Sequence, residues 1–231
     1  MDKTVSAQQA ITNVKEHHTI MVGGFGVPGT PFTLVDALLA QNTGHLTLIK
    51  NESNIAGLGV SKLVEKGLVN RIITSHLGLN KAVLGMMNRG EVEVEFNPQG
   101  ILAERIRCGG AGLIGLVTDI GIDTILRQDK QVITVDGRQG ILETALRANV
   151  ALIHAAVGDP LGNLCYEKSA RNFNPAMATA ADIVIAEVEQ LVDVGDLDPD
   201  QIHTPGAFVD HVVRIEELTS EYGILEDYVL G

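Results

Sequence analysis

A polar triplet, Asn51-Glu52-Ser53, stands directly after the apolar run at residues 46–49. In proteins built of alternating strands and helices, ligands and catalytic groups gather at the carboxyl ends of the strands. A carboxylate at such a place can attack an acyl group, orient a substrate or lie in a solvated loop. The triplet alone leaves these three roles of Glu52 open.

A second stretch with chemical potential is the glycine-rich segment at residues 23–31, GGFGVPGTP. It lacks the Gly-Lys-Ser/Thr ending of a nucleotide-phosphate loop, and prolines interrupt its partial match to a dinucleotide-binding pattern. Its glycines nevertheless allow close backbone approach and exposed N–H groups, and its prolines stiffen it. The alternative is a tight strand-to-helix connection that binds nothing. The candidate binding residues are Gly24, Phe25, Gly26, Val27, Pro28, Gly29 and Thr30.

These stretches lie in an alternating pattern of strands and helices. Thr30 is the expected N-cap of the helix that follows the glycine segment, with Pro31 as its first residue. Strands are predicted at 19–22, 45–49, 71–75, 92–96, 131–135, 149–157 and 183–188, and helices at 5–14, 32–39, 61–66, 81–88, 100–107 and from 175. A turn at 136–137, an acidic loop at 193–200 and a surface tail at 216–231 complete the pattern. It predicts an α/β fold with an open, mostly parallel sheet, helices on both faces and one domain over residues 1–231.

The composition excludes several classes of function. The 231 residues carry a net charge of -12, which argues against a nucleic-acid partner because phosphate backbones need a basic surface. Two cysteines, Cys108 and Cys165, predict two small buried side chains without a disulfide or zinc site. No His cluster with acids indicates a metal. With no signal peptide or membrane-spanning run, we expect a cytoplasmic protein that does not bind membranes.

Four motifs in order along the chain resemble those of the family I coenzyme A transferases, in particular the alpha, or A, subunit of the acetate/acetoacetate (3-oxoacid) type. They are the segment 23–31, NPQGILAERIRCGGAG at 97–112, DPLGNL at 159–164 and SARNFNP at 169–175. Together they span most of the chain and are much more specific than the glycine pattern alone. The family resemblance implies the α/β scaffold that these enzymes share with sugar-phosphate isomerases.

The resemblance also implies a reaction, in which CoA moves from an acyl-CoA to a free short-chain carboxylic acid without a metal. In the family, the nucleophile is a glutamate in a Glu-Asn-Gly motif on the beta subunit. This chain contains no Glu-Asn-Gly. We therefore expect no catalytic nucleophile here, a partner beta subunit, acyl-CoA and a carboxylic acid as substrates, and an α2β2 assembly.

The resemblance gives candidate roles to individual residues. Residues 24–30 would contact CoA, while Asn51, Glu52 and Gln99 would line the cleft and position the acyl group. A helix-capping amide is the alternative for Gln99. For Arg171, with Asn172 and Asn174 beside it, a buried hydrogen-bond network that positions loops is favoured. His76 and His154, near the ends of strands, are interpreted as structural histidines.

Two other functions remain alternatives at this stage. One is a ligand-binding or sensor module on a sugar-phosphate-isomerase-like scaffold, since a shared fold does not settle function. The other is a self-sufficient sugar-phosphate isomerase, whose expected lysine and paired acids are not recognisable here. The motifs at 97–112 and 169–175 favour the transferase.

Overall fold

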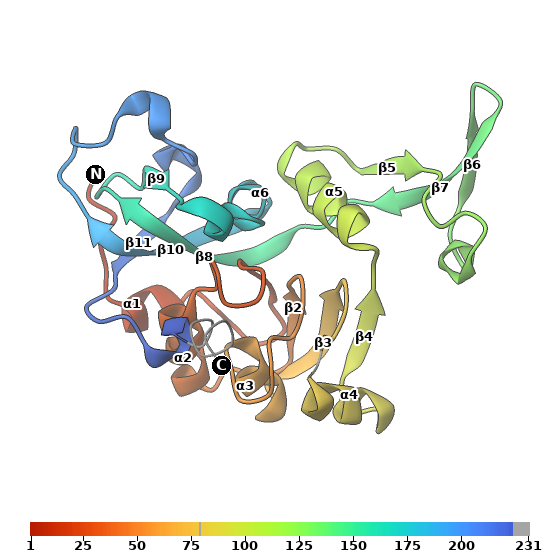
Figure 1. Cartoon of the computed structure of the whole chain (residues 1–231), viewed down its shortest axis with the longest axis horizontal. Helices are drawn as coiled ribbons and strands as arrows, with labels where there is room; N and C mark the ends of the chain where they lie inside the picture. Colours follow the sequence, from red (N-terminus) through yellow and green to blue (C-terminus); the bar gives the residue numbers. More distant parts are fainter. Residues whose placement is uncertain (79, 224–231) are drawn as a thin grey trace.

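The computed structural model describes residues 1–78 and 80–223, which form two β-sheets with helices packed on the larger one (Figure 1). The predicted surface tail therefore lies outside the described residues from residue 224 onwards. Its described part, up to residue 223, lies against the body of the protein rather than apart from it.

The larger sheet contains eight strands, and neighbouring strands along its main path are parallel. In spatial order they are β11 (His211–Arg214), β10 (Ala181–Leu191), β8 (Ala148–Gly158), β1 (Thr19–Val22), β2 (Leu46–Ile49), β3 (Val69–Thr74) and β4 (Glu93–Phe96). The short β9 (Leu164–Cys165) adds to β8 in antiparallel direction. The open, mostly parallel sheet predicted from the sequence is confirmed.

Apolar side chains on both faces of this sheet create two cores. In β1, Ile20 and Val22 belong to one buried cluster, and Met21 between them belongs to the other, as the two-residue repeat of a strand requires. Four helices cover the first face: α1 (Ala7–Ile11), α2 (Phe32–Gln41), α3 (Val60–Glu65) and α4 (Lys81–Asn88). On the second lie α5 (Gln99–Gly110) and α6 (Asn174–Thr179), so helices flank the sheet on both sides (Figure 1).

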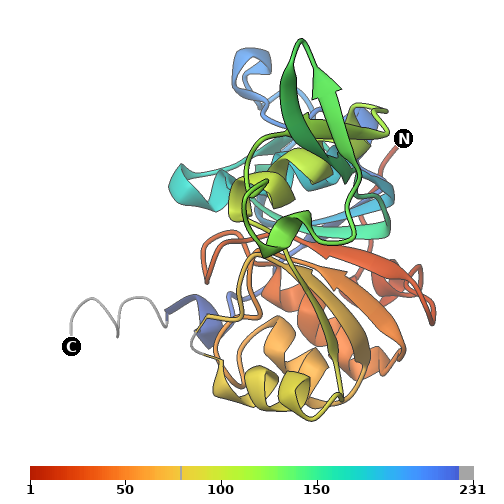
Figure 2. The same ribbon diagram turned by 90° about the vertical axis from the view of Figure 1, so that its right-hand side faces the viewer.

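A three-stranded antiparallel sheet projects from the body beyond α5 (Figures 1 and 2). Its order is β5 (Gly115–Thr118), β7 (Arg138–Thr144) and β6 (Val132–Val135). The predicted turn at Asp136 and Gly137 is confirmed, and both residues have the positive φ that a two-residue hairpin needs. The sequence did not predict β5 and β7, because each contains a glycine, Gly115 or Gly140, which weakens the strand pattern.

The predicted N-terminal helix at 5–14 is only five residues long, Ala7–Ile11. Ser6 caps it through a reciprocal pair of hydrogen bonds with Gln9, which fixes its start. At the other end, the Asn13 side chain donates to the carbonyl of Ala10 (2.8 Å) and so competes with continued helix. Predicted and observed bounds of most other elements differ by one to three residues, and β11 was not predicted.

Candidate functional site

The glycine segment lies where the order of the parallel sheet reverses. From β1 the chain proceeds outward through β2, β3 and β4, whereas the later strands β8, β10 and β11 add on the other side of β1. Connections that leave β1 and β8 therefore diverge at the carboxyl edge of the sheet, which is the usual ligand site of such folds. Residues 23–31 form the connection that leaves β1.

Glycine is required in this loop for two different physical reasons. A Cβ on Gly29 would lie 2.3 Å from the carbonyl oxygen of Ala170, and one on Gly24 would lie 2.1 Å from Thr30 Oγ1, so both positions are closed by packing. Gly26 has a φ of 64°, but the nearest atom to its Cβ would be Pro28 Cδ at 4.0 Å. Gly26 is therefore the point at which another molecule could approach the loop backbone.

Two asparagines, Asn172 and Asn174, fix the glycine loop through hydrogen bonds to its backbone. Asn172 Oδ1 accepts from the Gly24 N–H (3.2 Å), and its Nδ2 donates to the Pro28 carbonyl (2.9 Å). Asn174 Nδ2 donates to the Gly29 carbonyl (3.1 Å). The predicted network that positions loops is thus confirmed for the two asparagines, but Arg171 is exposed and was wrongly included in it.

Glu52 is buried and also fixes the glycine loop through a hydrogen bond to its backbone. Its Oε1 accepts from the Gly26 N–H (3.0 Å), and its Oε2 accepts from Asn51 Nδ2 (2.5 Å). Only 7% of its surface is exposed, which excludes the solvated-loop role considered above. Because both oxygens have donors, the carboxylate anchors the glycine loop to the end of β2.

The cation that compensates this carboxylate is Lys50, a residue to which the sequence analysis gave no role. It is completely buried, and its Nζ lies 3.4 Å from Glu52 Oε1. Nζ also donates to the carbonyl of Gly23 (3.0 Å) and to Thr30 Oγ1 (3.1 Å). Burial lowers the pKa of Lys50, while the charge of Glu52 opposes that change. The only hint in the sequence was a lysine at the end of an apolar strand.

Hydrogen bonds connect this anchor to the surface. Gln99 Nε2 donates to Asn51 Oδ1 (2.8 Å), and Ser75 Oγ lies 3.1 Å from the same oxygen. Asn51 is completely buried, whereas Gln99 is exposed at the first residue of α5. The helix-capping alternative for Gln99 is wrong, since no side-chain cap is present and its amide turns to Asn51. The path Gly26–Glu52–Asn51–Gln99 therefore joins all three segments predicted from the sequence.

The N-cap of α2 differs from the prediction. The N-cap residue is Pro31, the helix begins at Phe32, and the Thr30 hydroxyl donates to the carbonyl of Gly26 (2.8 Å) rather than capping the helix. The N–H of Leu34 in the first turn instead donates to Glu187 Oε2 (2.9 Å), a fully buried carboxylate from β10. The positive end of α2 is thereby already occupied by an internal anion.

His154 on β8 lies beside the same carboxylate, Glu187, and also beside Glu189; these three residues are called here the buried ion cluster. Its Nδ1 is 2.9 Å from Glu187 Oε1, and its Nε2 is 2.9 Å from Glu189 Oε1. Burial alone would lower the pKa of His154, but the two carboxylates raise it to about 9. The imidazolium therefore neutralises part of the acidic cluster, and the structural interpretation of this histidine is confirmed.

The loop residues differ in their access to solvent. Gly24, Val27, Gly29 and Thr30 are buried, Gly26 and Pro28 are partly exposed, and the Phe25 side chain is 48% exposed. The amides of Gly24 and Gly26 serve the internal bonds described above, and the Phe25 N–H donates to the Pro28 carbonyl (3.1 Å). The expected exposed N–H donors are therefore used internally at these three positions. The loop surface that a ligand can reach is therefore that of Phe25, Gly26 and Pro28.

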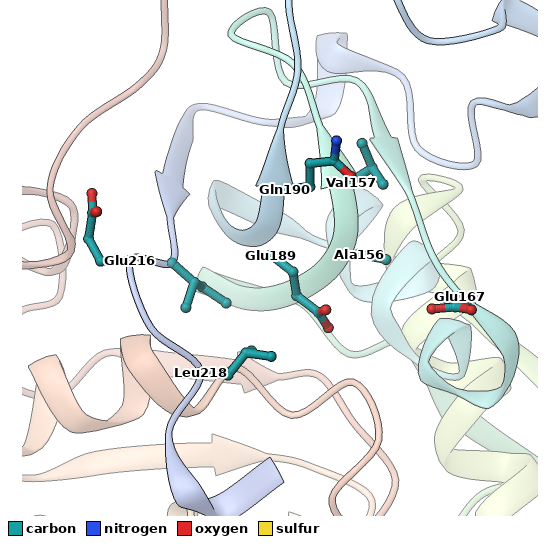
Figure 3. A pocket seen from close by; sticks show the side chains of 8 residues that line it. Ala156, Val157, Glu167, Glu189, Gln190, Glu216 and Leu218 are labelled. Carbon is teal, nitrogen blue, oxygen red and sulfur yellow. The ribbon is translucent and has the colours of Figure 1, made fainter. Parts of the chain in front are cut away.

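A separate pocket of about 380 Å³ lies farther along the carboxyl edge, at the ends of β8 and β10 (Figure 3). Its side chains include Glu167, Glu189 and Glu216 but none of the candidate residues. An acidic pocket repels anionic ligands, so it adds nothing to the site around the glycine loop. Among residues 1–78 and 80–223, no group of three or more His, Cys, Asp and Glu side chains could hold a metal ion.

Both cysteines are free, as expected; Cys108 is buried, but Cys165 is partly exposed, contrary to the prediction. None of the helices in the described part of the chain is long and apolar enough to cross a membrane.

Comparison with known proteins gives a consistent result. Residues 4–214 match the family model described as Coenzyme A transferase. The chain is 46% identical to the alpha subunit of acetate CoA-transferase from Escherichia coli (strain K12), over 93% of this chain and 98% of that protein. It is 45% identical to the corresponding subunit of the succinyl-CoA:3-ketoacid coenzyme A transferase from Xanthomonas campestris pv. campestris (strain B100), over 91% and 90% of the two chains.

Solved structures share the fold. The thioester complex with CoA of an acyl-CoA transferase from Escherichia coli O157:H7 superposes with a TM-score of 0.82 at 22% identity, over 94% of this chain. The present chain covers 48% of that solved chain, about half its length. Glutaconate coenzyme A-transferase from Acidaminococcus fermentans gives a TM-score of 0.80 at 20% identity, over 95% of this chain and 77% of that one.

Proposed function

Because the chain belongs to the coenzyme A transferase family, we propose that it is the alpha subunit of a short-chain acyl or 3-oxoacid CoA-transferase. Such an enzyme moves CoA from an acyl-CoA to a free carboxylic acid. The relatives described above are named as acetate and succinyl-CoA:3-ketoacid transferase subunits, which supports this class of substrates. CoA is a substrate here, and the chemistry needs no metal.

The reaction requires a nucleophilic carboxylate, which we assign to a glutamate of a beta subunit. That carboxylate attacks the thioester carbonyl, and the bond to sulfur breaks to give a mixed anhydride and CoA thiolate. The thiolate then attacks the glutamyl carbonyl, releasing the first acid and leaving a glutamyl-CoA thioester. The acceptor acid repeats these steps in reverse, so the free energy of the thioester is retained.

One observation carries the assignment of the site: a continuous hydrogen-bonded path joins Gly26, Glu52, Asn51 and Gln99 at the carboxyl edge of the sheet. Since Glu52 Oε2 accepts from Asn51 Nδ2, the Asn51 carbonyl must face Gln99 and accept from its Nε2. The second N–H of Gln99 is then available to a thioester or carboxylate oxygen. Asn51, Glu52 and Gln99 thus position the acyl group rather than react with it.

The glycine loop, Gly24 to Thr30, is proposed to contact CoA by shape. A phosphate cradle needs free N–H donors and a free helix N-terminus. Here Gly24, Phe25 and Gly26 use their amides internally, and Glu187 occupies the start of α2. We therefore assign the surface of Phe25 and Gly26 to the uncharged arm and thioester of acyl-CoA, from which the rigid loop excludes water.

The assembly and location follow from the same proposal. A site completed by a beta subunit would be enclosed between two chains, and an α2β2 heterotetramer is the proposed arrangement. We place the enzyme in the cytoplasm, where acyl-CoA and short-chain acids are available to it. The alternative of a sensor module on an isomerase-like scaffold has no support from the family match or the relatives.

The test uses the purified chain with and without a candidate beta subunit that contains the Glu-Asn-Gly motif. Incubation with an acyl-CoA followed by borohydride reduces a glutamyl thioester, and peptide mapping then identifies the modified glutamate. We expect turnover and modification only in the mixture, and only on the partner. Modification of Glu52, or turnover by this chain alone, contradicts the proposed division of labour.

A further inference from the structure

The segment 219–223, called here the C-terminal strap, lies beyond residues 4–214 that match the family model. It contains the short 3-10 helix η5 (Ser220–Gly223). The strap lies against the start of α2 and brings Tyr222 to the end of the glycine loop. Nothing in the family match or in the proposed reaction assigns a role to it.

The Tyr222 ring belongs to a small apolar cluster separate from the two main cores. This cluster contains Val27 of the glycine loop, Phe32 at the start of α2 and Leu58, with Tyr222 packed against them. The rings of Phe32 and Tyr222 meet edge to face, with centroids 4.8 Å apart. The strap therefore covers the side of the loop that the asparagines and Glu52 do not hold.

The hydroxyl of Tyr222 enters the buried ion cluster. It lies 2.5 Å from Glu187 Oε1, 3.0 Å from His154 Nδ1 and 3.0 Å from the carbonyl oxygen of Thr30. A phenol has one proton to donate, and the charge-assisted bond to Glu187 is the strongest choice. Since Glu187 also accepts from the Leu34 N–H, one carboxylate joins the strap to the first turn of α2.

A second attachment lies on the outer side of the strap. Glu221 Oε1 is 2.8 Å from Lys62 Nζ on α3, and the same ammonium pairs with Asp36 on α2. The ion pair adds little stability by itself, because Lys62 is partly solvated. Its geometric effect is to fix the strap across two helices, so that Tyr222 has one position relative to the loop.

We infer that Tyr222 is a positioning residue for the reaction, which holds the C-terminal end of the glycine loop in its binding conformation from outside the matched region. The inference rests on the proposed contact between this loop and acyl-CoA. Without the ring, the cluster of Val27, Phe32 and Leu58 loses part of its packing, and the loop end has to be ordered when CoA binds. Ordering one or two side chains corresponds to about a tenfold loss of affinity.

The experiment compares three variants of the assembled enzyme. Tyr222→Ala removes the ring and the hydroxyl, and Tyr222→Phe removes only the hydroxyl with its contacts to Glu187, His154 and the Thr30 carbonyl. Phe208→Ala is a control that truncates an exposed aromatic side chain elsewhere. Amide hydrogen exchange of residues 24–30 without CoA reports the order of the loop. Steady-state kinetics separate the KM for acyl-CoA from kcat.

We expect the loop amides to exchange faster in both Tyr222 variants than in the wild type. The KM for acyl-CoA should be about tenfold higher for Tyr222→Ala and about threefold higher for Tyr222→Phe, while kcat stays within about twofold of the wild-type value. The control should match the wild type. The inference is overturned if the variants exchange the loop amides no faster than the wild type, or if they exchange them faster without a change in KM. If Tyr222→Ala does not fold, Tyr222→Phe alone decides the inference. Failure of CoA to protect the wild-type loop from exchange would instead overturn the proposed function of the loop.

Discussion

Replacing His154 with glutamine should remove a pH-dependent part of the stability of this protein. His154 is 2% exposed and lies between Glu187 and Glu189 of β10, with the Tyr222 hydroxyl as the other titratable group in contact. Its protonated ring donates to both carboxylates, whereas a neutral ring can donate to only one. Glutamine retains a donor but carries no charge.

The magnitude follows from the raised pKa of His154, about 9 in the folded protein against 6.5 ordinarily. A histidine whose folded pKa is raised contributes stability that is fully present below pH 6.5 and is lost as the pH rises through 9. Each tenfold change in proton affinity corresponds to about 1.4 kcal/mol, so the imidazolium contributes on the order of 3 kcal/mol to the free energy of unfolding.

The assay is urea unfolding of the purified protein between pH 6 and 10, for the wild type, His154→Gln and a control at the exposed His76, His76→Gln. Taking the difference from the wild type removes the titration of all other groups. We expect His154→Gln to be about 3 kcal/mol less stable at pH 6.5, with most of that deficit gone at pH 10. A deficit that is independent of pH, or no deficit, refutes the assigned ion cluster.

Two further predictions concern the loop and its anchor. Gly26→Val should weaken the binding of CoA at least tenfold. The control, Gly67→Val, changes another open glycine with positive φ and should carry a similar backbone strain of about 1–2 kcal/mol without loss of binding. Equal CoA affinities of the two variants by calorimetry would remove Gly26 from the site. Lys50→Met should lower the free energy of unfolding by about 3–5 kcal/mol, because it leaves the buried Glu52 charge uncompensated. The double variant Lys50→Met/Glu52→Gln should recover much of this loss. If urea unfolding shows Lys50→Met to be as stable as the wild type, the buried ion pair is contradicted.

Much of the architecture was predictable because local patterns and the fold agree. Apolar runs such as those of β1, β8 and β10 are buried on both faces, and only a parallel sheet covered on both sides accommodates them. The projecting sheet was largely missed for the opposite reason. The two strands that were missed, β5 and β7, are partly exposed and contain a glycine, so their pairing is not evident from the local pattern. The single domain over residues 1–231 stays a prediction.

At the site, residue types were predictable but several of their partners were not. Thr30 was expected to cap a helix, and helix capping was the alternative role for Gln99, yet the Thr30 hydroxyl bonds to Gly26 and the Gln99 amide to Asn51. A capping preference describes the isolated helix, and a long-range partner in the folded chain can outcompete it. Lys50 escaped notice because a lysine is normally solvated, and only the folded environment supplies its buried anion.

The sequence by itself determined the family, the alternation of strands and helices, and the segments that meet at the carboxyl edge of the sheet, since each depends on residue order alone. The tertiary structure decided what those residues do. Glu52 became an anchor because Lys50, Asn51 and the Gly26 amide surround it, and the start of α2 was closed because β10 places Glu187 there. Charges and hydrogen bonds act over a few ångströms of space, and that proximity arises only when distant segments pack together.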